Sequence, residues 1–168
     1  MIKYLQNRRF LWLCLLLFSA TSTIQAAPPE QYEFKNLTHA MQDAAAQNKP
    51  MFLYFGRYGC STCRKMHKEV FTDEALHKHF ADHFVLAYVD TESDNRIRLP
   101  NGERTTEMQF TARNRILGTP TFIYFDAAQK PLFKKSGFQT VQQMLAYNRF
   151  VAEGIYQTQN LKQYMEND

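Results

Sequence analysis

The chain has 168 residues and a formal net charge of +4, from 20 basic and 16 acidic side chains. Three of the basic residues and none of the acidic ones lie in the first 26 residues, so the other 142 residues carry 17 basic and 16 acidic side chains, or +1. This balance excludes a protein that binds nucleic acid through a broad basic surface. A stretch of 142 residues is long enough for one domain with its own hydrophobic core.

Residues 1–26 have the pattern of a signal peptide. Three basic residues come first, nine apolar residues follow from Phe10 to Phe18, and Ala26 ends a segment typical of a cleavage site. A helix that spans a bilayer needs about 20 apolar residues, so this run is too short to do so comfortably. We therefore expect cleavage near Ala26 and export to the periplasm. An N-terminal membrane anchor that is not cleaved is the alternative.

After this segment we expect a short leader, residues 27–35, and one domain, residues 36–168. Apolar residues recur at helical spacing from Asn36 to Asn48, which predicts a helix. The apolar run from Met51 to Phe55 then predicts a buried strand.

Cys60 and Cys63 form a C-x-x-C motif at the start of the next predicted helix. A thiol at a helix N-terminus lies beside unpaired N–H groups and the positive end of the helix dipole, which favour the thiolate. We therefore predict that Cys60 is the nucleophile. Cys63, one helical turn later on the same face, is predicted to be the more buried thiol that closes a disulfide with Cys60.

A single C-x-x-C motif is also a pattern for metal binding. Structural zinc usually takes a second such motif or a pair of histidines, and Cys14, the only other cysteine, lies in the predicted signal peptide. Export would place the pair in an oxidising compartment, which favours a redox-active disulfide. A metal site and an inert pair are the alternatives. His79 and His83 also have ligand spacing, but we interpret them as part of a solvated helix face.

The rest of the chain alternates between helical and strand patterns. The predicted elements are a helix from Thr72 to Asp82, a strand from Phe84 to Asp90, a helix from Thr106 to Arg115, a turn and strand from Ile116 to Phe125, a strand from Leu132 to Lys135, a helix from Thr140 to Ala152 and a small helix in Thr158 to Asp168. This alternation predicts an α/β fold in which helices cover a sheet. The polar stretch from Thr91 to Arg104 is read as an insertion, with a client-selecting loop as our hypothesis.

The order of these elements, together with Gly118-Thr119-Pro120-Thr121, resembles the thioredoxin fold from Asn36 to Ala152. The resemblance implies a central mixed sheet with helices on both faces. Within this superfamily the chain is similar to the exported SoxW-type thioredoxins and, more distantly, to the C-terminal domain of the DsbD reductase. The residues that carry this closer likeness are Lys65-Met66-His67 and Glu69-Val70-Phe71 after the C-x-x-C motif, and Asn101-Gly102-Glu103 in the insertion.

The resemblance also implies a substrate-binding surface beside the cysteines. It implies a cis peptide bond between Thr119 and Pro120, and cis bonds are almost confined to X-Pro sequences. The backbone of Thr119 would then pair with an extended segment of the substrate. Tyr58, in the loop before Cys60, would border the docking surface. A trans proline that opens an edge strand is the alternative.

The sequence departs from ordinary thioredoxin at two informative places. Tyr54 stands where a buried acidic residue is usual, six positions before the first cysteine, and a phenol with a pKa of about 10 does not take up a proton at neutral pH. His67, four residues after Cys63, is therefore a candidate proton relay, with an ordinary packed or solvated residue as the alternative. Ser61 and Thr62 bring no positive charge between the cysteines, which favours a modest oxidant.

We therefore predict an exported thiol–disulfide oxidoreductase, most directly a reductase of disulfides in protein substrates. The two sulfurs carry both electrons, so we expect no dissociable cofactor and no metal. The resemblance implies a membrane electron donor of the DsbD or CcdA kind and clients among cytochrome c maturation or sulfur-oxidation proteins. A DsbA-like oxidase, an isomerase and a metallochaperone that binds Cu(I) through the two cysteines are the alternatives.

Overall fold

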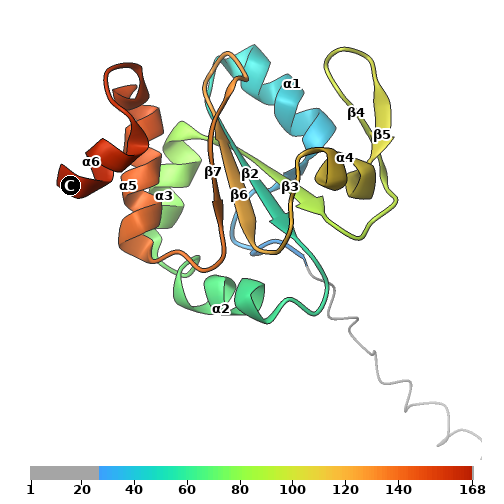
Figure 1. Cartoon of the computed structure of the whole chain (residues 1–168), viewed down its shortest axis with the longest axis horizontal. Coiled ribbons are helices and arrows are strands. Elements are labelled where there is room, and N and C mark those ends of the chain that lie inside the picture. Colours follow the sequence, from blue (N-terminus) through green and yellow to red (C-terminus); the bar gives the residue numbers. More distant parts are fainter. Residues whose placement is uncertain (1–26, 168) are drawn as a thin grey trace, which may run out of the picture.

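A computed structural model describes residues 27–167 (Figure 1). The predicted signal peptide, residues 1–26, lies outside the described residues. The elements are β1 (Lys35–Asn36), α1 (Leu37–Gln47), β2 (Met51–Gly56), α2 (Ser61–Glu69), α3 (Glu74–His83), β3 (Val85–Asp90), β4 (Arg96–Arg98), β5 (Arg104–Thr106), α4 (Glu107–Arg113), β6 (Thr121–Phe125), β7 (Pro131–Ser136), α5 (Val141–Ala152), the 3-10 helix η1 (Ile155–Gln157) and α6 (Leu161–Asn167). No helix in this part of the chain is long and apolar enough to cross a bilayer.

Five strands form the central sheet in the order β1-β3-β2-β6-β7. Strands β1 and β2 each run parallel to β3, β6 runs antiparallel to β2, and β7 runs antiparallel to β6. Strand β2 lies in the middle and all six of its residues are buried, because helices cover both faces of the sheet (Figure 1). The predicted α/β architecture, a mixed sheet with helices on both faces, is confirmed.

The two faces of β2 contribute to two separate apolar layers. Phe52 and Tyr54 belong to the layer that contains residues of α2, α3 and α5. Met51, Leu53 and Phe55 belong to the layer that contains residues of α1 and α4. This division follows from the alternation of side chains along a strand.

Polar side chains fix the helix starts that the sequence predicted. The Asn36 side chain accepts a hydrogen bond from the N–H of His39 and so caps α1. At the start of α4, Thr106 and Gln109 form a capping box, in which each side chain bonds the backbone N–H of the other. A capping box also begins α5.

Three features differ from the sequence prediction. Part of the stretch from Thr91 to Arg104 is not a loop, because β4 pairs antiparallel with β5. Strand β1 was not predicted, since two residues are too few for a periodic signal. The segment predicted as a leader also contributes to the core, because Tyr32 is only 5% exposed and packs edge-on against Phe71 and Phe80.

Candidate active site

Strand β2 leads directly into the turn that carries Cys60. Gly59 in this turn has φ +72°, a left-handed conformation that glycine adopts without steric cost. Cys60 is then the N-cap residue of α2. The helix is fixed to the rest of the domain by Met66, which is fully buried and whose sulfur accepts a hydrogen bond from the N–H of Gln139 at 3.3 Å.

Cys60 and Cys63 are joined by a disulfide, with their Cα atoms 5.2 Å apart. The N–H of Cys63 donates a hydrogen bond to Cys60 Sγ at 3.0 Å. This N–H is one of the donors that a helix start leaves without a backbone partner, and in the reduced protein it would favour a Cys60 thiolate. The two cysteines are 6% and 5% exposed, so the predicted difference in burial is not visible in the disulfide state.

The loop before β6 faces the disulfide. The carbonyl oxygen of Thr119 lies 3.4 Å from Cys60 Sγ, and the peptide bond between Thr119 and Pro120 is cis. The hydroxyl of Thr121 donates to the carbonyl of Gly118 at 2.7 Å and holds this loop in place. The structure thus brings together Cys60 and Thr119, which are 59 positions apart in the sequence.

Two exposed apolar side chains lie on the loops that reach Cys60. Tyr58, which the sequence singled out, is 65% exposed, and Leu117, two residues before Thr119, is 98% exposed. Sequence reasoning missed Leu117 because it placed this residue in a turn that leads into a strand. In the described part of the chain, the one other large apolar side chain of this kind is Met108 on α4.

A cavity of about 370 Å³ opens beside the disulfide. Its lining includes both cysteines, Tyr54, His67 and Tyr88. Within residues 27–167, no group of three or more His, Cys, Asp or Glu side chains is arranged to hold a metal ion. The cavity therefore places the cysteine pair beside the phenols of Tyr54, Tyr58 and Tyr88 and the imidazole of His67, which are groups that can exchange protons.

The hydroxyl of Tyr54 lies 2.9 Å from Nε2 of His67, at hydrogen-bond distance. Burial raises the pKa of Tyr54 far above its usual range, so the phenol keeps its proton. Burial also lowers the pKa of His67 below its ordinary value of 6.5, so the imidazole is neutral at pH 7. A neutral imidazole can accept a proton, and the predicted relay residue therefore faces the cavity in a suitable state.

Tyr88 on β3 is a residue of this site that the sequence did not identify. It pairs in register with Tyr54 on β2, and the two rings meet edge to face with centroids 5.3 Å apart. The end of β2 makes room for this ring, since a Cβ atom on Gly56 would lie only 2.7 Å from the Tyr88 hydroxyl. The alternation of β3 is visible in the sequence, but its register against β2 is not.

Comparison with known proteins places this geometry in a family. The model of the thioredoxin-like domain family matches residues 37–152. Among solved structures, the chain is similar to a thioredoxin-fold protein from Helicobacter pylori, with 24% identity and a TM-score of 0.60 over 72% of this chain and 80% of that one. A thioredoxin from Thermus thermophilus has 22% identity and a TM-score of 0.59 over 72% and 87% of the two chains.

A third similar structure is the reduced C-terminal domain of Neisseria meningitidis DsbD, with 15% identity and a TM-score of 0.54 over 68% of this chain and 93% of that one. Comparison with curated protein sequences found no match. The predicted thioredoxin fold is confirmed by these likenesses. Together with the Cys60–Cys63 disulfide, they support a thiol–disulfide oxidoreductase in general. The chain belongs to the thioredoxin-like domain family.

Proposed function

We propose that this protein is an exported reductase of protein disulfides. The observation that carries the proposal is the position of Cys60. Its sulfur lies at the N-terminus of α2, between the N–H of Cys63 and the carbonyl of Thr119, and it is bonded to a second cysteine one helical turn away. This arrangement suits a nucleophilic Cys60 whose mixed disulfide with a substrate is then broken by the neighbouring Cys63.

The reaction transfers two electrons from the Cys60–Cys63 dithiol to a substrate disulfide. The Cys60 thiolate attacks one substrate sulfur, and the other substrate sulfur leaves as a thiolate that takes up a proton. The Cys63 thiolate then attacks Cys60 Sγ, the mixed disulfide breaks, and the second substrate sulfur leaves. The substrate ends as a dithiol and the protein as the Cys60–Cys63 disulfide.

The second step requires that Cys63 lose its proton, and we propose His67 as the acceptor. Both side chains line the same cavity, and the imidazole is neutral at pH 7 because burial lowers its pKa. Tyr54 holds this imidazole through the 2.9 Å contact between its hydroxyl and Nε2. The pair would serve where thioredoxins usually place a buried carboxylate.

The substrate is proposed to bind along the loop that contains Thr119 and Pro120. Among the described residues, no backbone hydrogen bond satisfies the N–H of Thr119, and its carbonyl faces Cys60. An extended substrate segment can therefore pair with this backbone. Tyr58 and Leu117 would provide apolar contact on either side, since both are exposed on loops next to Cys60.

The cellular context of the proposal comes from the predicted signal peptide and from the likeness to SoxW-type proteins. An exported reductase needs electrons from the cytoplasm, and a membrane donor of the DsbD or CcdA kind would supply them. The structural likeness to the C-terminal domain of DsbD is in keeping with a protein partner of this class. Clients would be exported proteins whose disulfides must be opened, such as those of cytochrome c maturation or sulfur oxidation.

Reduction of insulin with dithiothreitol as the electron donor tests the proposal directly. The protein should accelerate the reaction, Cys60→Ser should abolish the acceleration, and Cys63→Ser should accumulate a mixed disulfide with insulin that mass spectrometry detects. A protein that leaves the rate of insulin reduction unchanged, or a Cys60→Ser variant as active as the original, would refute it.

A further inference from the structure

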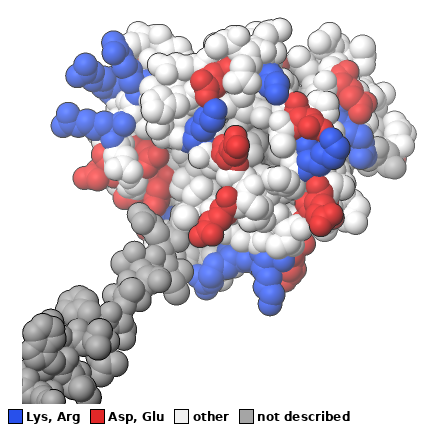
Figure 2. Space-filling view, turned by 180° about the vertical axis from the view of Figure 1, so that it is seen from behind, with Lys and Arg blue, Asp and Glu red and all other residues white. Residues whose placement is uncertain are grey.

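The hairpin formed by β4 and β5 carries three arginines on one side. Arg96 and Arg98 flank the buried Ile97 on β4, and Arg104 on β5 lies directly opposite Arg98. Because strand residues alternate between two faces, the three exposed side chains share the outward face of the hairpin. Figure 2 shows basic side chains gathered at the upper left edge of the molecule, where this hairpin lies. We refer to Arg96, Arg98 and Arg104 as the arginine face.

The arginine face lacks an ion-pair partner in the part of the chain that the structure describes. Within residues 27–167, no carboxylate lies at ion-pair distance from any of its three side chains, although acidic side chains are visible beside the basic cluster in Figure 2. Like charges directly opposite each other destabilise a pair of strands, so the fold gains nothing from the placement of Arg98 against Arg104. A role outside the fold would account for it.

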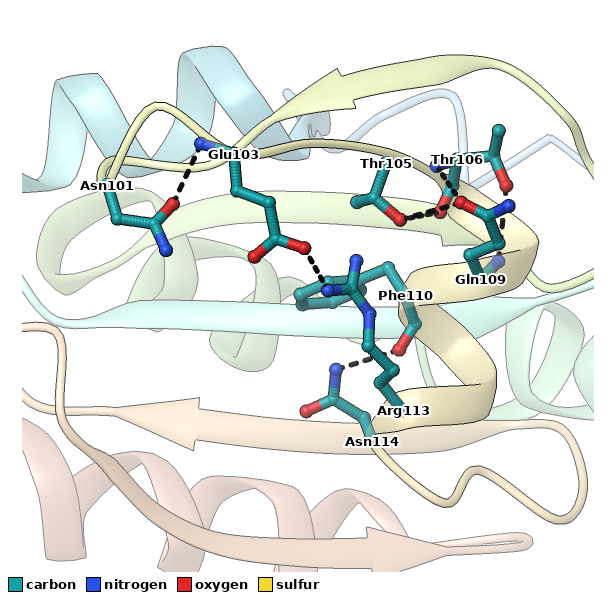
Figure 3. Close-up of polar contacts among 8 residues, drawn as sticks. All are labelled: Asn101, Glu103, Thr105, Thr106, Gln109, Phe110, Arg113 and Asn114. Carbon is teal, nitrogen blue, oxygen red and sulfur yellow. Dashed lines mark hydrogen bonds and ion pairs between the residues drawn. The ribbon is translucent and has the colours of Figure 1, made fainter.

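The nearest acidic side chains of this region already have partners. Glu103, on the turn between the two strands, forms an ion pair with Arg113 of α4 (Figure 3). Glu107 is 6% exposed and accepts side-chain hydrogen bonds from Ser93 and Asn95. The arginines therefore remain available to an external anionic group.

The hairpin is also held rigidly. The hydroxyl of Thr38 accepts a hydrogen bond from the N–H of Arg98 at 2.9 Å and donates to its carbonyl at 3.1 Å, which fixes β4 to α1. On the other strand, Thr105 and Thr106 bond the side chain of Gln109 at the start of α4 (Figure 3). Because the backbone of the hairpin is anchored in this way, its ordering adds little to the entropic cost of binding a ligand.

We propose that the arginine face binds an acidic, extended segment of a partner protein. It lines a hollow of about 590 Å³ together with Asn36, Thr38 and His39 of α1 and its cap. Asn95, Ile97 and Glu107 complete the lining, and the Glu107 carboxylate is the one that already accepts hydrogen bonds from Ser93 and Asn95. Guanidinium groups bind carboxylates through paired hydrogen bonds. Arg96 and Arg98 are two residues apart on a strand, or roughly 7 Å, which matches carboxylates on alternate residues of an extended chain.

The spread of the three charges favours a peptide segment over a small anion. A small anion is best bound by donors that converge on one enclosed point. These side chains are exposed, with Arg96 and Arg98 spaced along β4 and Arg104 across from Arg98 on β5. Because the partner would be a client or an electron donor of the proposed reductase, the identity of the partner rests on that function. The binding itself does not depend on the cysteines and can be tested separately.

The test uses a fluorescent, cysteine-free peptide in which glutamate alternates with serine. Its binding to the oxidised protein is measured by fluorescence anisotropy at low salt. A peptide with glutamine in place of glutamate is the matched neutral probe. The triple variant Arg96→Gln, Arg98→Gln, Arg104→Gln should bind the glutamate peptide about tenfold more weakly, because each exposed ion pair contributes little by itself. The control Lys78→Gln, Lys130→Gln, Lys162→Gln removes the same net charge elsewhere and should bind like the original protein.

The proposal would be overturned if the two peptides bound equally well, or if both triple variants lost the same affinity for the glutamate peptide. Displacement of the peptide by inorganic phosphate at matched ionic strength would also overturn it, because it would indicate a small-anion site. The arginine variant should keep its thermal stability, because the lost charges repel one another. Insulin reduction in the same preparations reports on the thiol chemistry alone. Its absence in the original protein would refute the proposed reductase without bearing on the arginine face.

Discussion

The Tyr54 hydroxyl and His67 Nε2 meet at 2.9 Å, although the two residues are 13 positions apart and belong to β2 and α2. The contact links the centre of the sheet to the helix that carries the cysteines. Each partner is neutral at pH 7, because burial raises the pKa of the phenol and lowers that of the imidazole. The site thus keeps a proton acceptor near Cys63 without a buried negative charge.

This arrangement predicts a pH dependence for the step in which Cys63 releases a bound thiol. Neutral His67 is the acceptor, so the rate should rise with pH up to the lowered pKa of His67 and then level off. His67→Gln should lose this rise and be slower at pH 7 by about a hundredfold, the lower end of the usual contribution of a general base. Stopped-flow release of thionitrobenzoate from a mixed disulfide with Cys60 measures the rate.

Tyr54→Phe should slow the same step by a smaller factor, because it leaves the imidazole in place but removes its hydrogen-bond partner. His83→Gln, which changes an exposed histidine at the end of α3, is the matched control and should behave like the original protein. A His67→Gln variant with the original pH profile would show that another group, such as water, takes the proton.

Local signals in the sequence were sufficient for the parts of the site that lie close together in the chain. The spacing of Cys60 and Cys63 and the helix start at Cys60 depend on neighbouring residues only, and both are confirmed. The same holds for the helices predicted to begin at Asn36 and Thr106, since these residues are the N-caps of α1 and α4. Cis geometry before Pro120 came from the family resemblance and agrees with the structure.

Contacts set by strand register could not be read from the sequence. Tyr88 meets Tyr54 only because β3 and β2 pair in one particular register, and Tyr54 reaches His67 only because α2 packs over the end of the sheet. The β4–β5 hairpin was also missed, since three-residue strands give no periodic pattern. Tertiary packing decides all of these features.

The reduction potential of the Cys60–Cys63 pair should be close to that of thioredoxin, about −270 mV, and well below that of DsbA, about −120 mV. The reason is that Ser61 and Thr62 place no positive charge beside Cys60, so its thiolate is stabilised mainly by the N–H of Cys63. Equilibration with glutathione or dithiothreitol buffers gives the value. A potential near that of DsbA would make the protein an oxidant of its substrates.

The exposed side chains of Tyr58 and Leu117 should matter for protein substrates only. Leu117→Ser and Tyr58→Ser remove apolar surface from the two loops that reach Cys60, so each should lower kcat/KM for insulin by about threefold to tenfold, as expected for loss of an exposed apolar contact. The rate with a small aromatic disulfide should be unchanged. Met108→Ser removes an exposed apolar side chain on α4 and is the control; equal loss in all three variants would argue against a specific docking surface.

Gly56→Ala should destabilise the fold by about 1–3 kcal/mol, the usual cost of overpacking. A Cβ atom at this position would lie 2.7 Å from the hydroxyl and 2.9 Å from a ring carbon of Tyr88, whose ring is packed against Tyr54. Gly118→Ala is the matched control, because nothing lies within 4 Å of its added carbon, and its effect should stay within about 0.5 kcal/mol. Urea unfolding of both variants measures the difference, and equal stability would mean that Tyr88 can move aside freely.

Glu107 should make the stability of the fold depend on pH. Burial is the main cause that raises the pKa of this carboxyl above its ordinary value of 4.5, and the nearby Asp90 adds to the effect. A raised pKa means that the folded state holds the proton more tightly than the unfolded state does. Below pH 4.5, burial of the protonated Glu107 carboxyl therefore does not reduce the free energy of unfolding. As the pH rises through the ordinary pKa towards the raised one, the free energy of unfolding decreases.

Glu107→Gln isolates this contribution, because the amide is of similar size and does not ionise. The unfolding free energy of the original protein minus that of the variant should decrease from pH 4 to pH 7. Urea unfolding at each pH measures this difference. Glu74→Gln, which removes an exposed carboxylate in the first turn of α3, is the control for loss of a surface charge. If the difference for Glu107→Gln stayed constant or moved the other way, the hydrogen bonds from Ser93 and Asn95 would outweigh the cost of burying the charge.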